Sequence, residues 1–298
     1  MAKPIIKAGF CVAYDWELLK RSLPIVYPHA DLICLSVDKD RKSWSGVPYA
    51  FDEADFQAWL KLIDTDHKII LHEAVFSDTK NTTIQNDNLQ RSSMAEAMGK
   101  GGWHIQVDAD EYFLDFKGFR DYLLKINPSP QGTEKPVNIC ANWISLIKKV
   151  PAGYLYVKND PYKYETTPFA TNVPEFAHAR RNGHFDHISP FFVLHETWAR
   201  GEEQLRQKLE SWGHSDDFTS RLSYFNLWKS LDEHNYQYIR NFHPIAAEVW
   251  QELGFAPAAG IDELLQWLNV HPLKTLPAAY YTKRNSRIVQ GLRQRLGK

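Results

Sequence analysis

The sequence predicts an α/β protein with a mixed, mainly parallel sheet, flanked by helices and followed by a helical C-terminal region. Short apolar runs, typical of buried strands, alternate with amphipathic segments over residues 5–126. Of the 298 residues, 44% are apolar, which is enough for one large core or two smaller ones. We expect a first domain over residues 1–200 and a helical extension over residues 201–298 that packs on it.

The elements of the first half follow from this alternation. Asn86 and Asp87 are typical of a helix start and Gly99 of a helix end, so they bound one helix directly. The others rest on apolar periodicity. We expect strands at residues 5–13, 31–37, 68–74 and 103–109, and helices at residues 16–25, 52–63, 86–99 and 118–126.

In the second half of the chain, expected strands and helices alternate less regularly. Strands are expected at residues 137–148 and 153–157, on either side of Pro151. Residues 162–174 are polar, aromatic and interrupted by prolines, which is typical of a mobile substrate loop. A short buried strand over residues 190–194 ends at His195, and the chain from Gly201 on is expected to be mainly helical.

Composition excludes several classes. A formal net charge of −1 argues against a dedicated nucleic-acid binder. No apolar run approaches the length of a membrane span, and the first residues lead into an apolar strand, so we expect a cytoplasmic protein without a signal peptide. The three cysteines Cys11, Cys34 and Cys140 lie in apolar segments and form no Cys-x-x-Cys pair, which predicts buried, reduced thiols.

Glycine-rich phosphate-binding motifs are missing from the sequence. No Gly-x-Gly-x-x-Gly follows the first expected strand, and no Gly-x-x-x-x-Gly-Lys-Ser/Thr occurs. These motifs bring backbone N–H groups close to a phosphate in dinucleotide-dependent dehydrogenases and in P-loop enzymes. Both classes are therefore disfavoured.

The most informative segment is Trp-His-Ile-Gln-Val-Asp-Ala-Asp-Glu-Tyr-Phe, residues 103–113. Its alternation places Asp108 and Asp110 on one face at the end of an apolar strand. Two like charges there are costly unless a cation holds them, which favours Mn²⁺ or Mg²⁺. Asp38, which ends another strand, is expected on the same edge of the sheet. Alternatively, Asp108, Asp110 and Glu111 only begin a solvated turn.

This segment, Arg91 in the preceding helix, Asp38 and the later run Val-Leu-His-Glu-Thr (residues 193–197) together resemble a glycosyltransferase of the GT-A fold. The similar group is family 2-like, with an Asp-Ala-Asp-Glu signature. The resemblance is strongest over residues 86–113 and 191–212. It implies a Rossmann-type nucleotide-sugar-binding and catalytic domain over residues 1–200.

The resemblance also implies roles for single residues. Asp108, Asp110 and His195 would hold the metal, and the donor would contact Asp38, Arg91, Asp108 and Lys208. Each assignment has an alternative: His195 as a structural hydrogen-bonding group, Lys208 as one charge on a solvated helix face, and Arg91 in a structural pair with Asp110 or Glu111. After Asp38 the sequence departs from the Asp-Gly-Ser-x-Asp of many relatives, which leaves the donor nucleotide open.

Inverting transfer needs a group that accepts the proton of the acceptor hydroxyl. Glu165, Glu175 and Asp186 are the candidates, beside Asp110 as a catalytic residue of the signature. No clear acceptor motif separates them, so retaining chemistry stays open. The Gln-x-x-Arg-Trp motif of processive synthases is incomplete at residues 237–241, which favours single additions.

The implied function is metal-dependent transfer of a sugar from a UDP- or GDP-sugar to a glycan or lipid-linked oligosaccharide, in bacterial lipopolysaccharide or capsule synthesis. Two alternatives stay open. A metal-dependent phosphoester hydrolase would use the same aspartates with the clustered histidines. A non-catalytic carbohydrate-binding protein would use the many aromatic residues, among them ten tryptophans and fourteen tyrosines.

The last residues are basic. From Lys274 on there are seven Lys or Arg residues and no acidic one, and Ile288, Val289, Leu292 and Leu296 share one helical face. Such a helix can lie on an anionic surface, here the inner face of the membrane. Alternatively, it packs its apolar stripe on the protein and exposes the basic face.

Overall fold

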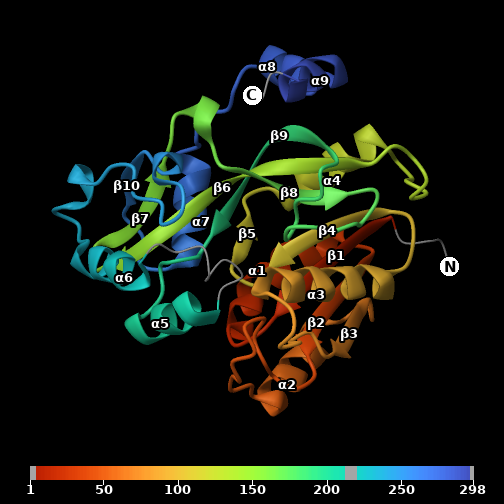
Figure 1. Ribbon diagram of the computed structural model, residues 1–298, viewed down its shortest axis with the longest axis horizontal. Helices are drawn as coiled ribbons and strands as arrows, with labels where there is room; N and C mark the ends of the chain where they lie inside the picture. The colour runs from red at the N-terminus through yellow and green to blue at the C-terminus, as the bar shows by residue number, and fades with distance from the viewer. Residues whose placement is uncertain (1–4, 212–219, 296–298) are drawn as a thin grey trace. The chain divides into compact units, whose positions relative to one another are not determined.

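The computed structural model describes residues 5–211 and 220–295. Contacts divide the chain into two compact units (Figure 1). Unit 1 comprises residues 1–140 and 167–188, and unit 2 comprises residues 141–166 and 189–298. Residues 201–298 thus share unit 2 with earlier segments, and the division into a catalytic domain and an extension at residue 200 stays a prediction.

The sheet of unit 1 is mainly parallel, which confirms the predicted α/β fold class. Strands β4, β1, β2 and β3 are parallel neighbours in that order, and β8 pairs with β4 in the antiparallel direction. Their bounds are β1 Ile6–Val12, β2 Leu32–Asp38, β3 Ile69–Ala74, β4 Trp103–Asp108 and β8 Thr166–Thr171. The four parallel strands lie within one residue of the predicted ranges; the apolar runs of β1, β2 and β4 are buried, whereas β3 is partly exposed.

Four α-helices belong to unit 1: α1 Leu19–Val26, α2 Glu53–Ile63, α3 Thr83–Met98 and α4 Phe116–Ile126. Helix α3 contacts β1 and β2 (Figure 1). It approaches β1 so closely that a Cβ on Gly9 would lie 2.8 Å from Met94 Cε. The helix begins three residues before the predicted Asn86, because Thr82 and Gln85 form a capping box.

One prediction for the middle of the chain is wrong, and another is confirmed only in part. Part of the supposed mobile loop at residues 162–174 is strand β8, and its Phe169 is buried against Phe113 at 5.2 Å between ring centroids. The short strand at residues 190–194 is longer, β9 Phe185–His195, which pairs with β5 Glu111–Phe113 and β6. Pairing and burial override the polar composition of these segments.

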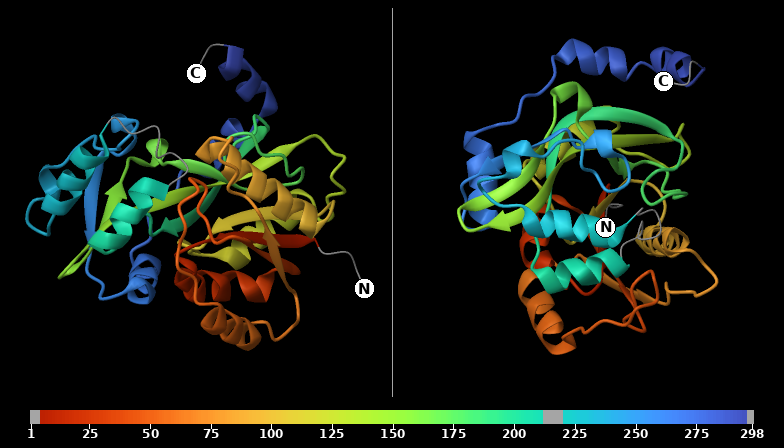
Figure 2. Two further views of the ribbon diagram at one scale, coloured as in Figure 1. Left: turned by 60° about the horizontal axis from the view of Figure 1, so that its bottom comes forward. Right: turned by 60° about the vertical axis from the view of Figure 1, so that its left-hand side comes forward.

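The described residues of unit 2 form an antiparallel sheet and five α-helices. Strands β6 Val137–Val150, β7 Gly153–Lys158 and β10 Glu252–Ala256 are neighbours (Figure 2). The helices are α5 Glu202–Ser211, α6 Arg221–Ser230, α7 Ile261–Val270, α8 Ala278–Arg284 and α9 Arg287–Arg295. The region after Gly201 is mainly helical as predicted, with β10 as the exception.

Aromatic side chains build the core of unit 2. Trp198, Trp228 and Trp250 are all buried, and the Trp228 indole donates to the carbonyls of Ile147 and Trp198 at 2.7 and 3.0 Å.

The prediction of buried, free cysteines is confirmed for Cys11, Cys34 and Cys140. Among the helices of the described residues, none is long and apolar enough to cross a bilayer.

Candidate active site

Strand β4 brings the first aspartate of the signature to the carboxyl end of the parallel sheet of unit 1. Asp108 is the last residue of β4, and Asp110 lies in the turn that leads to β5. The Asp108 side chain is 29% exposed, whereas Asp110 is buried. The two carboxylates therefore do not extend one strand face, and only Asp108 has appreciable access to solvent.

Arg91 holds Asp108 from helix α3. Its Nη2 donates to Asp108 Oδ1 at 3.0 Å, and its Nε donates to Asp87 Oδ1 at 2.7 Å. Asp87 and Arg91 are four residues apart on α3, so their side chains meet on one helix face. A structural pair for Arg91 was one of the predicted alternatives, but its partners are Asp87 and Asp108 instead of Asp110 or Glu111.

A second arginine, Arg180, reaches the same carboxylate. Its Nη2 lies 3.0 Å from Asp108 Oδ2, and its two terminal nitrogens donate to Glu111 Oε1 and Oε2 at 2.9 and 2.6 Å. Glu111 Oε2 also accepts from the backbone N–H of Asp108 at 2.7 Å. Arg180 was not predicted, because the local sequence Ala-Arg-Arg-Asn does not indicate a partner about 70 positions earlier in the chain.

A tight turn presents Arg180. The N–H of Arg181 donates to the carbonyl of His178, and Ala179 in this turn has a φ of +53°, a conformation that is costly for a residue with a Cβ. Asn88 of α3 ties the turn down: its Nδ2 donates to the Ala177 carbonyl, and its Oδ1 accepts from the Ala179 N–H, both at 2.8 Å. The arginine is thus positioned by helix α3 as well as by its ion pairs.

The five side chains form a continuous ion-pair chain, in the order Asp87, Arg91, Asp108, Arg180 and Glu111. Three carboxylates face two guanidiniums, so its formal charge is −1. Burial raises the pKa of Glu111 to about 7, while Arg180 acts in the opposite direction. Four members are 0–6% exposed and Asp108 is 29% exposed, so the chain presents one oriented carboxylate to solvent.

Asp38 ends strand β2 and is buried. Its Oδ1 accepts from the N–H groups of Asp40 and Lys42 at 3.0 and 3.1 Å, and its Oδ2 accepts from Phe76 N–H at 2.7 Å. The carboxylate thereby orders the chain after β2 and after β3. Its role as a contact to the nucleotide base stays a prediction.

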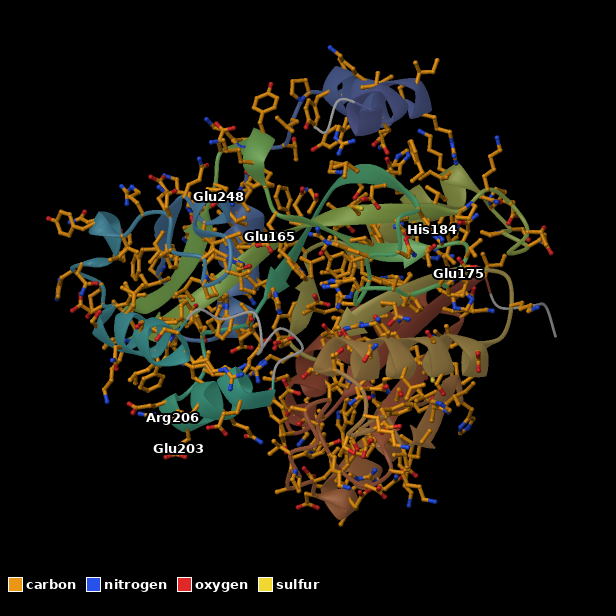
Figure 3. All side chains as sticks on the ribbon, viewed as in Figure 1. Glu165, Glu175, His184, Glu203, Arg206 and Glu248 are labelled. Atoms are coloured by element: carbon orange, nitrogen blue, oxygen red, sulfur yellow. The ribbon has the colours of Figure 1, made fainter. Side chains whose placement is uncertain are left out.

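The predicted bases of unit 1 lie in and around the segment between β8 and β9. Glu175, 72% exposed, lies 3.3 Å from His184 Nε2, and Figure 3 shows the two residues in this segment. Asp186 Oδ1 accepts from Asn138 Nδ2 at 2.9 Å. Each of these carboxylates has its own partner, and their assignment as bases stays a prediction.

The remaining predicted residues belong to unit 2. The His195 ring lies 4.8 Å from the Trp143 ring, centroid to centroid. Lys208 is buried, and its Nζ lies 5.8 Å from the Trp198 ring centroid. The alternative that Lys208 is one charge on a solvated helix face is therefore wrong. The roles of His195 as a metal ligand and of Lys208 as a contact to the diphosphate stay predictions.

The ligand set for a metal is incomplete among residues 5–211 and 220–295, where no group of three His, Cys, Asp or Glu side chains could hold an ion. Both oxygens of Asp108 are engaged by guanidiniums, whose positive charges compete with a divalent cation. These donors do not by themselves fit Mn²⁺ or Mg²⁺. Metal binding at Asp108, Asp110 and His195 stays a prediction.

Comparison with solved structures gives distant matches. No family model and no curated protein matches the chain. It is similar to S. aureus TarS 1–349 with 10% identity and a TM-score of 0.32, over 56% of this chain and 46% of that one. It is also similar to a 4-diphosphocytidyl-2C-methyl-D-erythritol synthase with 10% identity and a TM-score of 0.33, over 57% and 74% of the two chains. The chain thus spans less than half of TarS 1–349, and similarity at this level transfers no function.

Proposed function

We propose that this protein is a glycosyltransferase that moves a sugar from a UDP- or GDP-sugar to a glycan or lipid-linked acceptor. One observation carries the proposal: an oriented, partly exposed carboxylate, Asp108, at the carboxyl end of a central parallel strand. Ligands of α/β sheets bind beyond this end of the strands. The surrounding ion-pair chain holds the carboxylate in one orientation.

The chemistry of transfer matches such a site. Departure of the nucleoside diphosphate builds positive charge at the anomeric carbon and negative charge on the leaving group. The Asp108 carboxylate can accept hydrogen bonds from hydroxyl groups of the donor. It lies between two guanidiniums, the side chains best suited to bind phosphate oxygens. Binding and orientation are therefore the roles that Arg91, Asp108 and Arg180 support.

The finer parts of the proposal rest on the sequence. They are dependence on Mn²⁺ or Mg²⁺, a general base among Glu165, Glu175 and Asp186, and a place in bacterial lipopolysaccharide or capsule synthesis. The cytoplasmic location belongs here too, as does contact of the basic C-terminal helix with the inner membrane face. Of that helix, Ile288 is 77% exposed, whereas the side chains from Leu292 on lie outside the described residues.

The test begins with a panel of UDP- and GDP-sugars, scored by nucleotide release with and without manganese. With the best donor, Asp108→Asn and Asp110→Asn should each lower turnover by about a hundredfold or more, measured on protein that circular dichroism shows to be folded. Asp121→Asn, on the surface of α4, is the matched control and should keep full activity. Near-normal turnover of both site variants would refute the assignment.

A further inference from the structure

The guanidinium of Arg180 lies between two carboxylates of the signature segment. Its Nη2 is 3.0 Å from Asp108 Oδ2 and 2.6 Å from Glu111 Oε2, so one nitrogen of a charged group bridges two acidic side chains. Its Nη1 donates to Glu111 Oε1 at 2.9 Å, which fixes the orientation of the guanidinium. Neutralising the carboxylates of this segment is the role that the family resemblance gives to Mn²⁺ or Mg²⁺.

The other oxygen of Asp108 is also matched by a positive charge. Arg91 Nη2 lies 3.0 Å from Asp108 Oδ1. Each oxygen of this carboxylate therefore has a guanidinium at hydrogen-bonding distance. A divalent ion bound directly to Asp108 would either lie beside two fixed positive charges, which repel it, or displace one of them.

Displacement of either arginine is unfavourable, because each has a second carboxylate partner that is buried. Arg91 Nε donates to Asp87 Oδ1 at 2.7 Å, and these side chains are 3% and 4% exposed. The Arg180 side chain is 6% exposed and its partner Glu111 is 0% exposed. An arginine that moved away would leave a buried carboxylate without its counter-ion, which is strongly destabilising.

We propose that Arg180 is a built-in counter-ion that takes the place of a divalent metal between Asp108 and Glu111. The structure disagrees at this point with the dependence on Mn²⁺ or Mg²⁺ that rests on the sequence. While Arg180 is in place, Asp108 binds no divalent ion. The consequence for catalysis rests on the proposed function: transfer should then proceed in EDTA.

The first measurement is a titration of the full-length protein with Mn²⁺, followed by the electron paramagnetic resonance signal of the hydrated ion. Asp108→Asn removes the charge of the predicted ligand. Because Asp108 is not a ligand, this variant should show the same Mn²⁺ affinity as the unaltered protein. A loss of affinity of about tenfold or more in Asp108→Asn would overturn the proposal.

The second measurement removes the counter-ion. Arg180→Ala leaves Asp108 and Glu111 as neighbouring carboxylates, so Mn²⁺ should bind about tenfold or more tightly than to the unaltered protein. Added Mn²⁺ should also raise the unfolding midpoint of Arg180→Ala more than that of the unaltered protein, because a ligand stabilises the folded state that binds it.

The matched control is Arg181→Ala, which removes an exposed arginine from the same turn. It should bind Mn²⁺ like the unaltered protein. Equal Mn²⁺ affinities of Arg180→Ala and Arg181→Ala would show that Arg180 does not stand where a cation can bind. If Arg180→Ala does not fold, the titration of the unaltered protein and Asp108→Asn decides the question by itself.

Failure of this proposal is distinguishable from failure of the proposed function, because Mn²⁺ binding is measured without a sugar donor. Turnover that requires manganese, together with Mn²⁺ binding that is lost in Asp108→Asn, would reject the counter-ion and keep the transferase. Unchanged Mn²⁺ affinity in Asp108→Asn, with no nucleotide released from any donor, would reject the transferase and keep the counter-ion.

Discussion

Two ion-pair clusters, one in each unit, differ in how far they are buried. In unit 1 the ion-pair chain from Asp87 to Glu111 is almost entirely buried at the end of the parallel sheet. In unit 2 Glu202 pairs with Arg206 and Lys229 at 3.2 and 3.1 Å, and all three side chains are 42–58% exposed; Figure 3 labels Arg206 on α5. Burial removes water as a competing partner, so the buried ion pairs fix the orientation of their side chains. The exposed pairs do not, because water can replace either partner.

Arg180→Ala should have the largest effect on stability. The substitution leaves Glu111, which is 0% exposed, without its bidentate partner. A buried pair broken on one side costs about 3–5 kcal/mol, so urea unfolding should show a loss of that order. Arg181→Ala removes an exposed arginine from the same turn and should change little. A loss equally small for Arg180→Ala would contradict the importance of the buried chain.

The pH dependence of stability should reveal His104, a buried polar residue of β4. Burial, and then Lys7, lowers the pKa of His104 to about 4 from 6.5. Between these values the unfolded chain binds the proton and the folded chain does not, so stability falls as pH drops from about 6.5 towards 4. The full loss is on the order of 3 kcal/mol.

The measurement for His104 is the difference in unfolding free energy between the protein and His104→Leu at pH 7 and near pH 4.5. The variant lacks the titrating group, so its stability should decline less over this interval. Other groups that titrate are common to both proteins and cancel in the difference. Parallel pH profiles would show that His104 is not held neutral by its surroundings.

Asn88→Ala should have an intermediate effect. It removes the two hydrogen bonds that tie the turn with Ala179 to helix α3. We expect a loss of about 1–2 kcal/mol in unfolding free energy. Asn88→Asp keeps the acceptor for the Ala179 N–H and should lose less. If both variants match the unaltered protein, Arg180 is positioned by its ion pairs alone.

Glu202→Gln should have the smallest effect. Its partners Arg206 and Lys229 stay in water, which solvates them as well as the carboxylate does. The unfolding free energy should stay within experimental error at low and at high salt. A clear, salt-dependent loss would remove the contrast between the two units.

The sequence predicted most elements of unit 1 but few of its side-chain contacts. Apolar runs locate β1, β2, β3 and β4 to within a residue, because a short apolar run bounded by polar residues is typical of a strand, whether it is buried as in β1, β2 and β4 or partly exposed as in β3. Strand β8 was missed, since its Thr-rich sequence becomes a strand only through pairing with β4. Helix α3 begins before the predicted Asn86, because the capping box of Thr82 and Gln85 sets its first turn.

The residues of the candidate site were also predicted only in part from the sequence. Local pattern placed Asp108 at a strand end and identified Arg91 as a polar residue of the helix before it. Arg180 could not be found, because an arginine in a turn has the same local sequence whether it faces water or a carboxylate. Its partners, Asp108 and Glu111, come from strands far away in the chain.

By itself the sequence determined the α/β class, the parallel strands and the carboxylate at the end of β4, because hydrophobic periodicity and turn chemistry act between residues that are close in the chain. Only the tertiary structure decided which charges meet, which stay exposed and which aromatic rings lie at the surface. Those outcomes depend on contacts between residues far apart in the chain and on the removal of water around them, and neither is encoded in local pattern.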